Sequence, residues 1–241
     1  MKKFAFVSIL LLLGSVGPAQ AQEAHAQEKK PTRYPAMASA DQYLMATAQD
    51  EIALARTAAP PSISADADVL VLTKRGYETA VKGKNGLVCF VERAWTASFD
   101  DAEFWNPKSR APNCFTPAAV RSVLPQYIKR SEWVMSGATR EQLIDKVRAA
   151  FASHQFVAPE PGAFSYMLSK QGYLGDGVAG PWLPHLMFFV DKGQAVAWGA
   201  GTDGSPILGG DKSPVDLTIL LVPVRRWSDG SPGPAPEPVK H

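Results

Sequence analysis

The spacing of apolar residues near the N-terminal end of the chain is helical. Between residues 40 and 57 apolar side chains recur every three or four positions, and Ser39 with Gln42 forms a capping-box sequence at their start. Pro60-Pro61 follows, and proline cannot continue a helix. This pattern predicts one amphipathic helix over residues 40–57.

From residue 69 the apolar pattern changes to that of β-strands. Three strand candidates cover residues 69–73, 77–81 and 87–91, and Asn85-Gly86 lies between the last two. An Asn-Gly pair favours the positive φ angles of a tight hairpin turn. The sequence therefore predicts a three-stranded antiparallel meander.

The middle of the chain contains two more helical patterns. Thr116-Pro117 resembles an N-cap followed by proline at the first helical position, and the apolar stripe behind it ends at Gly137 with a kink expected at Pro125. Thr139 opens a second stripe that reaches residue 151. We therefore expect two helices here, in addition to the one over residues 40–57.

More than half of the glycines and prolines lie beyond residue 158, which favours strands and long loops over helices. Strand candidates in this part are 163–168, 186–190 and 217–224. The predicted fold is a single α+β domain over residues 39–228. It has a mostly antiparallel sheet of about six strands, with three helices on one face.

The first 21 residues are typical of a secretory signal peptide. Met1–Lys3 is a basic head, Phe4–Leu13 is apolar, and Ala19-Gln20-Ala21 provides a small-x-small cleavage sequence before Gln22. A retained membrane anchor is the alternative, but a spanning helix needs about 20 apolar residues. We expect a periplasmic or secreted protein with a flexible leader over residues 22–38 and a proline-rich, disordered tail over residues 229–241.

The charge balance narrows the range of partners. The chain has 25 Lys and Arg against 23 Asp and Glu, a net charge of +2, and Lys2 and Lys3 supply the surplus. Without the signal peptide the protein is neutral, so it lacks a field that would attract nucleic acid or anionic lipid. We expect no nucleic-acid partner and no membrane insertion after signal cleavage. A small molecule or a component of the cell envelope remains as the partner.

The chain has two cysteines, Cys89 and Cys114. In an oxidising compartment an even pair most often forms a disulfide. The alternative is a nucleophilic thiolate, which would need a free cysteine beside a base. The compartment argument favours the disulfide.

Familiar catalytic and cofactor motifs are missing. The chain has no G-x-S-x-G, S-x-x-K, Walker, H-E-x-x-H or paired C-x-x-C sequence, so we expect no cofactor and no metal site. Gly175–Gly180 matches G-x-G-x-x-G, but Pro181 and Pro184 follow directly and exclude the helix that a dinucleotide site requires. We interpret this match as accidental.

His185 is the leading candidate for chemistry, because it enters an apolar strand from a glycine-rich loop. It could act as a general base with Asp176 or with the acidic cluster Asp100, Asp101 and Glu103. It could also bind a ligand, or be a structural histidine hydrogen-bonded to a loop carbonyl. The acidic cluster itself could be a solvated loop that tucks its neighbouring aromatic rings onto the core.

Aromatic residues in the loops suggest a recognition surface. The candidate ligand-binding residues are Trp95, Phe99, Trp105, Tyr173, Trp182 and His185. Two hypotheses follow. The first is a non-catalytic ligand-binding or interaction module of the cell envelope. The second is a hydrolase-type enzyme that uses His185 with Asp176 or the acidic cluster, with or without a metal.

Several segments carry a resemblance to a known group of proteins. They are 76–83, 85–89, 104–108, Cys114, 167–170, 184–188 and 227–230. On these segments the chain resembles an uncharacterised family of exported bacterial proteins, over about residues 52–230. The resemblance implies one domain and a periplasmic setting, and it implies no activity or ligand.

Overall fold

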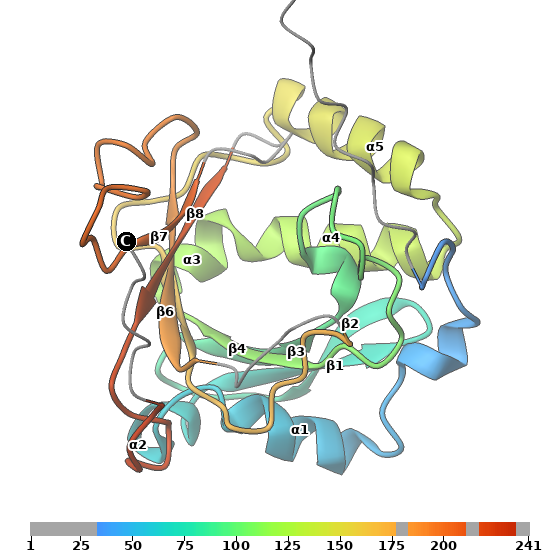
Figure 1. Cartoon of the computed structure of the whole chain (residues 1–241). Helices are drawn as coiled ribbons and strands as arrows, with labels where there is room; N and C mark the ends of the chain where they lie inside the picture. The colour runs from blue at the N-terminus through green and yellow to red at the C-terminus, as the bar shows by residue number, and fades with distance from the viewer. Residues whose placement is uncertain (1–32, 177–182, 211–216, 235–241) are drawn as a thin grey trace, which may run out of the picture. The chain divides into compact units, whose positions relative to one another are not determined.

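A single curved sheet organises the part of the chain that the structure describes (Figure 1). This computed structural model describes residues 33–176, 183–210 and 217–234. Within them, eight strands pair in the order β2-β1-β3-β4-β5-β6-β8-β7. The strands are β1 (Asp68–Thr73), β2 (Gly76–Val81), β3 (Val88–Glu92), β4 (Ala111–Phe115), β5 (Phe164–Met167), β6 (His185–Val190), β7 (Leu208–Gly210) and β8 (Thr218–Pro223).

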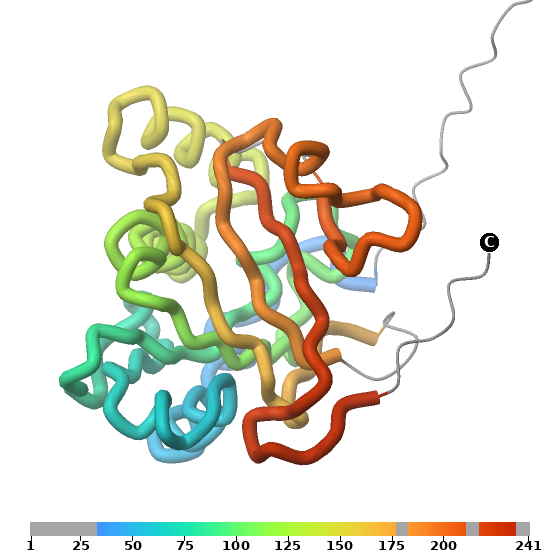
Figure 2. The backbone as a smooth tube through the Cα atoms, turned by 90° about the vertical axis from the view of Figure 1, so that its left-hand side faces the viewer, coloured from blue at the N-terminus to red at the C-terminus, as the bar shows by residue number. Residues whose placement is uncertain are grey.

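Helices pack on both sides of this sheet. Two of them, α1 (Ala48–Arg56) and α2 (Pro61–Ser64), lie on the outer side of β1, β3 and β4 (Figure 1). Three others, α3 (Pro117–Ser122), α4 (Leu124–Met135) and α5 (Arg140–Ala152), belong to the concave side. Two 3-10 turns, η1 (Ala40–Tyr43) and η2 (Ala94–Thr96), complete the described elements. In Figure 2, β5, β6 and β8 run side by side along the face toward the viewer.

Strand alternation divides the core into two layers. On β3, Val88 and Phe90 point into the large cluster beneath α3, α4 and α5, whereas Cys89 and Val91 point into a smaller cluster beneath α1. Successive side chains of a strand face opposite sides of the sheet, so a strand covered on both sides is apolar throughout. All five residues of β3 are buried for this reason.

The predicted helix over residues 40–57 is wrong in its first half. Residues Ala40–Tyr43 form only the 3-10 turn η1, and α1 begins after Thr47, whose side chain accepts a hydrogen bond from the Asp50 backbone amide at 3.0 Å. Tyr43 explains why the helix does not begin at residue 40. Its side chain is fully buried, and its hydroxyl donates a hydrogen bond to the Trp105 carbonyl oxygen at 2.8 Å. A tertiary contact therefore overrides the capping-box sequence at Ser39.

The predicted meander is also wrong in its pairing. The strand β3 does not pair with β2; it pairs with β1, and in parallel. The loop between β2 and β3 crosses the start of β1 instead of forming a hairpin, since Lys84 and Asn85 donate their backbone amides to the Asp66 carbonyl oxygen at 2.8 and 3.2 Å. A Cβ on Gly83 would lie 2.2 Å from that same oxygen, so glycine permits the close crossing.

The α+β class is confirmed, whereas the element counts and the placement of the helices differ from the prediction. The described residues contain eight strands and five helices, and the helices lie on both faces of the sheet. Sequence patterns missed β4, which contains Pro112, and β7, which contains two glycines, because both residue types disfavour strands. The predicted interruption at Pro125 is confirmed by the separation of α3 from α4, and the capping box of Thr139 and Gln142 begins α5.

Some predictions concern parts of the chain outside the described residues. The signal peptide over residues 1–21, residues 22–32 of the leader and the tail beyond residue 234 are among them. The described residues after Pro31 belong to one compact unit. Among the described helices, none combines the length and apolar character that crossing a membrane requires.

The predicted disulfide is confirmed. Cys89 on β3 and Cys114 on β4 are directly opposite in the antiparallel ladder and are bonded to each other. Both side chains are fully buried in the smaller core cluster under α1. The bond joins β3 to β4 on the side of the sheet that α1 covers.

Removing this disulfide should destabilise the fold. The bond closes a loop of 25 residues, for which chain entropy gives about 3.5 kcal/mol of stabilisation. We expect guanidinium unfolding of the double variant Cys89→Ala/Cys114→Ala to show a loss of that order. Reductant should lower the unfolding midpoint of the wild type and leave that of the variant unchanged. Two reactive thiols in the unfolded, unreduced wild type would contradict the assignment.

Candidate functional site

His185, the first residue of β6, is a buried histidine. Its ring is 8% exposed, and Nδ1 lies 2.8 Å from the Leu183 carbonyl oxygen. Burial lowers the pKa of the imidazole below its ordinary value, although the contact with Leu183 opposes this shift. The ring therefore favours the neutral form at pH 7. This environment matches that of a structural histidine hydrogen-bonded to a loop carbonyl.

The carboxylate of Asp176 is hydrogen-bonded to side chains other than His185. Its Oδ2 accepts hydrogen bonds from Arg33 Nη1 and from the Tyr34 hydroxyl, both at 2.6 Å, and its Oδ1 accepts one from the Tyr173 hydroxyl. These bonds, with Tyr173 contributing most, hold the pKa of the carboxyl well below its usual range. Asp176 thus joins the segment around residue 33 to the loop that follows Tyr173, which is a positioning role.

The aromatic loop does not form the predicted exposed surface. Trp95 is 0% exposed and donates its indole N–H to Ser131 Oγ at 3.0 Å, while Phe99 and Trp105 are also buried in the large core cluster. Arg130 of α4 lies over the Phe99 ring, with its guanidinium carbon 4.3 Å from the ring centre. This loop is therefore part of the core. Tyr173 remains partly exposed, and Trp182 lies outside the described residues.

The acidic residues of the same loop cap local turns. Asp101 Oδ1 accepts the Glu103 backbone amide at 2.7 Å, and Glu103 Oε2 accepts the Asn106 side-chain amide at 2.7 Å. Asp100 accepts a hydrogen bond from the Ser98 hydroxyl. These contacts fit a solvated loop whose rings pack inward. Within the described ranges, no cluster of three or more His, Cys, Asp or Glu side chains is arranged to hold a metal ion.

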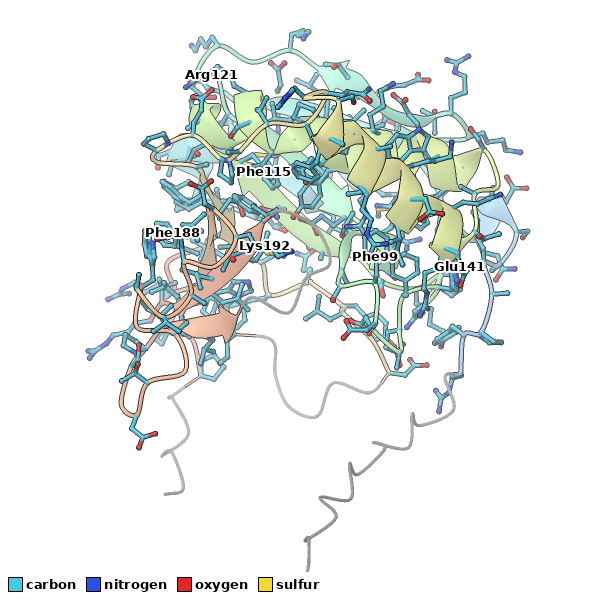
Figure 3. All side chains as sticks on the ribbon, turned by 90° about the horizontal axis from the view of Figure 1, so that it is seen from above. Phe99, Phe115, Arg121, Glu141, Phe188 and Lys192 are labelled. Atoms are coloured by element: carbon cyan, nitrogen blue, oxygen red, sulfur yellow. A yellow bond between two sulfur atoms is a disulfide. The ribbon has the colours of Figure 1, made fainter. Side chains whose placement is uncertain are left out.

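An aromatic row that the sequence did not indicate lies on the outer side of β5 and β6. Phe164 stacks on Phe188 with ring centres 5.3 Å apart, and Phe188 contacts Trp198 of the following loop at 5.9 Å. Phe188 projects to the side of the sheet away from Phe115, which points toward α4 (Figure 3). The row attaches the loop after β6 to the sheet. Strand alternation could have revealed it, but its residues belong to two separate strands and a loop.

A buried carboxyl lies at the end of β3, on the concave side. Glu92 accepts hydrogen bonds from the Thr96 hydroxyl at 2.7 Å and from the Asn113 side-chain amide. Burial raises its pKa to about 6, while these two hydrogen bonds and the charge of Arg130 oppose the shift. The side chain is 6% exposed, so this group is closed to ligands in the structure. We interpret it as a polar element of the core.

A surface cleft does occur at the end of α1, on the other side of the sheet. It has a volume of about 320 Å³, which is near the lower end for small-molecule sites. One wall comes from α1 and α2, with Ala53, Arg56, Pro61 and Ala65, and the opposite wall carries Ser228 and Asp229. We call this site the Arg56 cleft.

The two walls of the Arg56 cleft are joined by the segment that follows β5. Leu168 donates its amide to the Ala58 carbonyl oxygen at 2.9 Å, and its own carbonyl oxygen accepts the Ser228 amide at 2.9 Å. The hydroxyls of Thr57 and Ser169 share a hydrogen bond of 2.6 Å. Backbone hydrogen bonds of Leu168 therefore connect the two walls of the cleft, although these walls are more than 150 residues apart in the chain.

Arg56 is the distinctive group of this cleft. In the described part of the chain, no side chain or carbonyl oxygen accepts a hydrogen bond from its guanidinium, and its Nε is covered by protein. Asp229, on the other wall, is already engaged: its Oδ2 accepts Lys170 Nζ at 2.8 Å and its Oδ1 accepts the Ser231 amide at 2.9 Å. Among the described residues, the Arg56 guanidinium thus has neither an ion-pair partner nor a hydrogen-bond acceptor.

Sequence reasoning missed Arg56. A basic residue in the last turn of a helix is ordinary, because it is favoured by the helix dipole. The signals near the cleft were Pro60-Pro61, interpreted only as a helix end, and the segment 227–230, noted only for its resemblance. Neither segment indicates by its sequence that Arg56, in a distant helix, lies in the same cleft.

The Glu92 carboxyl makes a pH prediction possible. Its folded-state pKa of about 6 exceeds the unfolded value near 4.5, so the folded state binds the proton more tightly. The stability contribution of this proton is present at low pH and is lost as the pH rises through 6. Relative to Glu92→Gln, the wild type should lose about 2 kcal/mol of unfolding free energy between pH 4 and pH 7. Urea unfolding at both pH values measures this difference, with Asp145→Asn on the exposed side of α5 as the control. A pH-independent difference between wild type and Glu92→Gln would contradict the prediction.

Comparison of the chain with known proteins identified no family for it. Neither the protein-family models, nor the curated proteins, nor the solved structures contain a match to this chain. Function therefore has to be inferred from the residues and contacts of the chain itself.

Proposed function

We propose that this protein is a ligand-binding module of the cell envelope, and that its ligand lies in the Arg56 cleft. The observation that carries the proposal is Arg56, which lines an otherwise mainly apolar cleft and whose guanidinium has no acceptor in the described part of the chain. Buried or half-buried polar groups are ordinarily hydrogen-bonded, and an unpaired charge in an apolar recess favours a ligand that pairs with it.

The structure of the cleft supports binding. Its walls are held by backbone hydrogen bonds through Leu168, so a ligand would meet a largely preformed site. A preformed site lowers the entropy that binding must overcome. The disulfide between Cys89 and Cys114 supports an exported location, because disulfides persist in oxidising compartments.

Hydrolysis has less support than binding. The predicted enzyme pairs His185 with Asp176, so it needs the Asp176 carboxylate within hydrogen-bond reach of the imidazole and free to bind it. Nδ1 of His185 faces the Leu183 carbonyl oxygen, and the carboxylate of Asp176 is bonded to Arg33, Tyr34 and Tyr173. These contacts suit structural roles for both residues.

A cleft-filling substitution tests this function. Ala53 lines the cleft and is exposed on α1, so Ala53→Phe should occupy the site without disturbing the core. Ala48→Phe, on the same helix and also exposed, is the matched control outside the cleft. We expect a panel of small acids, amides, amines and sugars to include compounds that shift backbone amide NMR signals of residues 53–65 and 228–229.

Those shifts should disappear in Ala53→Phe and persist in Ala48→Phe. Both variants should unfold within about 1 kcal/mol of the wild type, because an exposed Ala→Phe change in a helix costs only its difference in helix propensity. Equal binding by the two variants, or shifts confined to residues outside the cleft, would refute the proposed function.

A further inference from the structure

The polar groups of the Arg56 cleft define the charge of its ligand. Asp229 is paired with Lys170, and Lys170 together with Ser231 keeps the pKa of Asp229 well below its usual range. Arg56 has no ion-pair partner and no hydrogen-bond acceptor within the part of the chain that the structure describes. The cleft therefore favours an anion over a neutral or cationic ligand, by charge complementarity.

The shape of the guanidinium indicates the kind of anion. Its Nε is covered by protein, so a ligand meets the terminal edge with the two Nη groups. That edge can donate two parallel hydrogen bonds to the two oxygens of a planar carboxylate. The Asp229 carboxylate on the facing wall would repel a second negative charge, which makes a monoanion more favourable than a phosphate dianion.

The remaining lining indicates the rest of the ligand. Ala53, Ala59, Ala65 and Pro61 line the cleft beside Arg56, and the exposed surface of the cleft is mainly apolar. Such a surface gains free energy when it contacts an apolar group and gains nothing from a polar one. A cleft of about 320 Å³ also limits the ligand to a small molecule or to the end of a larger one.

We infer that the Arg56 cleft binds a small organic monocarboxylate with an apolar body, whose carboxylate pairs with the Arg56 guanidinium and whose hydrocarbon part rests on the alanine and proline wall. This inference rests on the proposed function, since it names the chemical class of the ligand for the same cleft.

Matched acids and amides test the charge requirement. Benzoate with benzamide, and hexanoate with hexanamide, have nearly the same shape and differ in charge. In NMR titrations of the isolated protein we expect each acid to bind about tenfold more tightly than its amide, as a charge-assisted hydrogen bond contributes. Added salt should weaken the binding of the acid and leave that of the amide nearly unchanged.

Variants assign this preference to one residue. Arg56→Gln should remove most of the tenfold preference, and Arg56→Lys should retain part of it, because lysine keeps the charge but not the planar pair of donors. Arg148→Gln is the matched control, since Arg148 is exposed on α5 and causes the same change in net charge. It should leave the preference unchanged.

Two failures can be told apart. If the amides bind as tightly as the acids and still shift the signals of residues 53–65, the carboxylate inference is overturned while the binding function stands. The carboxylate inference is likewise overturned if Arg56→Gln keeps the acid preference. If none of the four probes reaches the cleft and the wider panel binds elsewhere or not at all, both proposals fail together.

Discussion

A buried ion pair between Glu51 of α1 and Arg93 at the end of β3 holds the structure around the cleft in place. Their side chains are 2% and 0% exposed, and Arg93 Nη2 lies 2.9 Å from Glu51 Oε1. The same carboxylate oxygen accepts the Leu72 backbone amide at 3.1 Å, and Arg93 Nε donates to the Tyr43 carbonyl oxygen at 2.8 Å. Removing one partner of such a pair costs about 3–5 kcal/mol, because the other charge stays buried alone. The pair therefore ties α1 to the sheet and to η1 at one point.

The position of α1 decides where Arg56 lies. Arg56 is five residues after Glu51, so docking the helix through the ion pair leaves its last turn near the end of β5, where the Ala58 carbonyl oxygen accepts the Leu168 amide. The disulfide between Cys89 and Cys114 lies beneath the same helix, within the smaller core cluster. The helix, the covalent bond and the backbone contacts together form the wall of the cleft.

Comparison with the other covered arginines shows why Arg56 is unusual. Arg130 donates to the carbonyl oxygens of Trp95 and Ala97, and Arg110 donates to those of Pro107 and Ser109 at 2.8 Å. Burial lowers the pKa of both groups to about 10. In the residues that the structure describes, the Nε of Arg130 is buried without an acceptor, as is that of Arg56, but the terminal nitrogens of Arg130 and Arg110 donate to carbonyl oxygens. Arg56 has no acceptor in the described part of the chain. The difference is therefore at the terminal nitrogens, which have acceptors in Arg110 and Arg130 and none among the described residues in the half-buried Arg56.

Most of the local elements and the disulfide could be predicted from the amino-acid sequence. Apolar spacing indicated α5 and the strands β1, β5, β6 and β8, and the compartment argument paired Cys89 with Cys114. Periodicity and capping act within a few residues, so these features can be predicted from the chain alone. Three features could be recognised only in the folded structure. They are the parallel pairing of β1 with β3, the burial of Trp95, Phe99 and Trp105, and the cleft at Arg56. Each of these depends on contacts between distant segments, such as Gly83 crossing β1 or Ser228 facing α1, and no local pattern specifies which distant residue a side chain will meet.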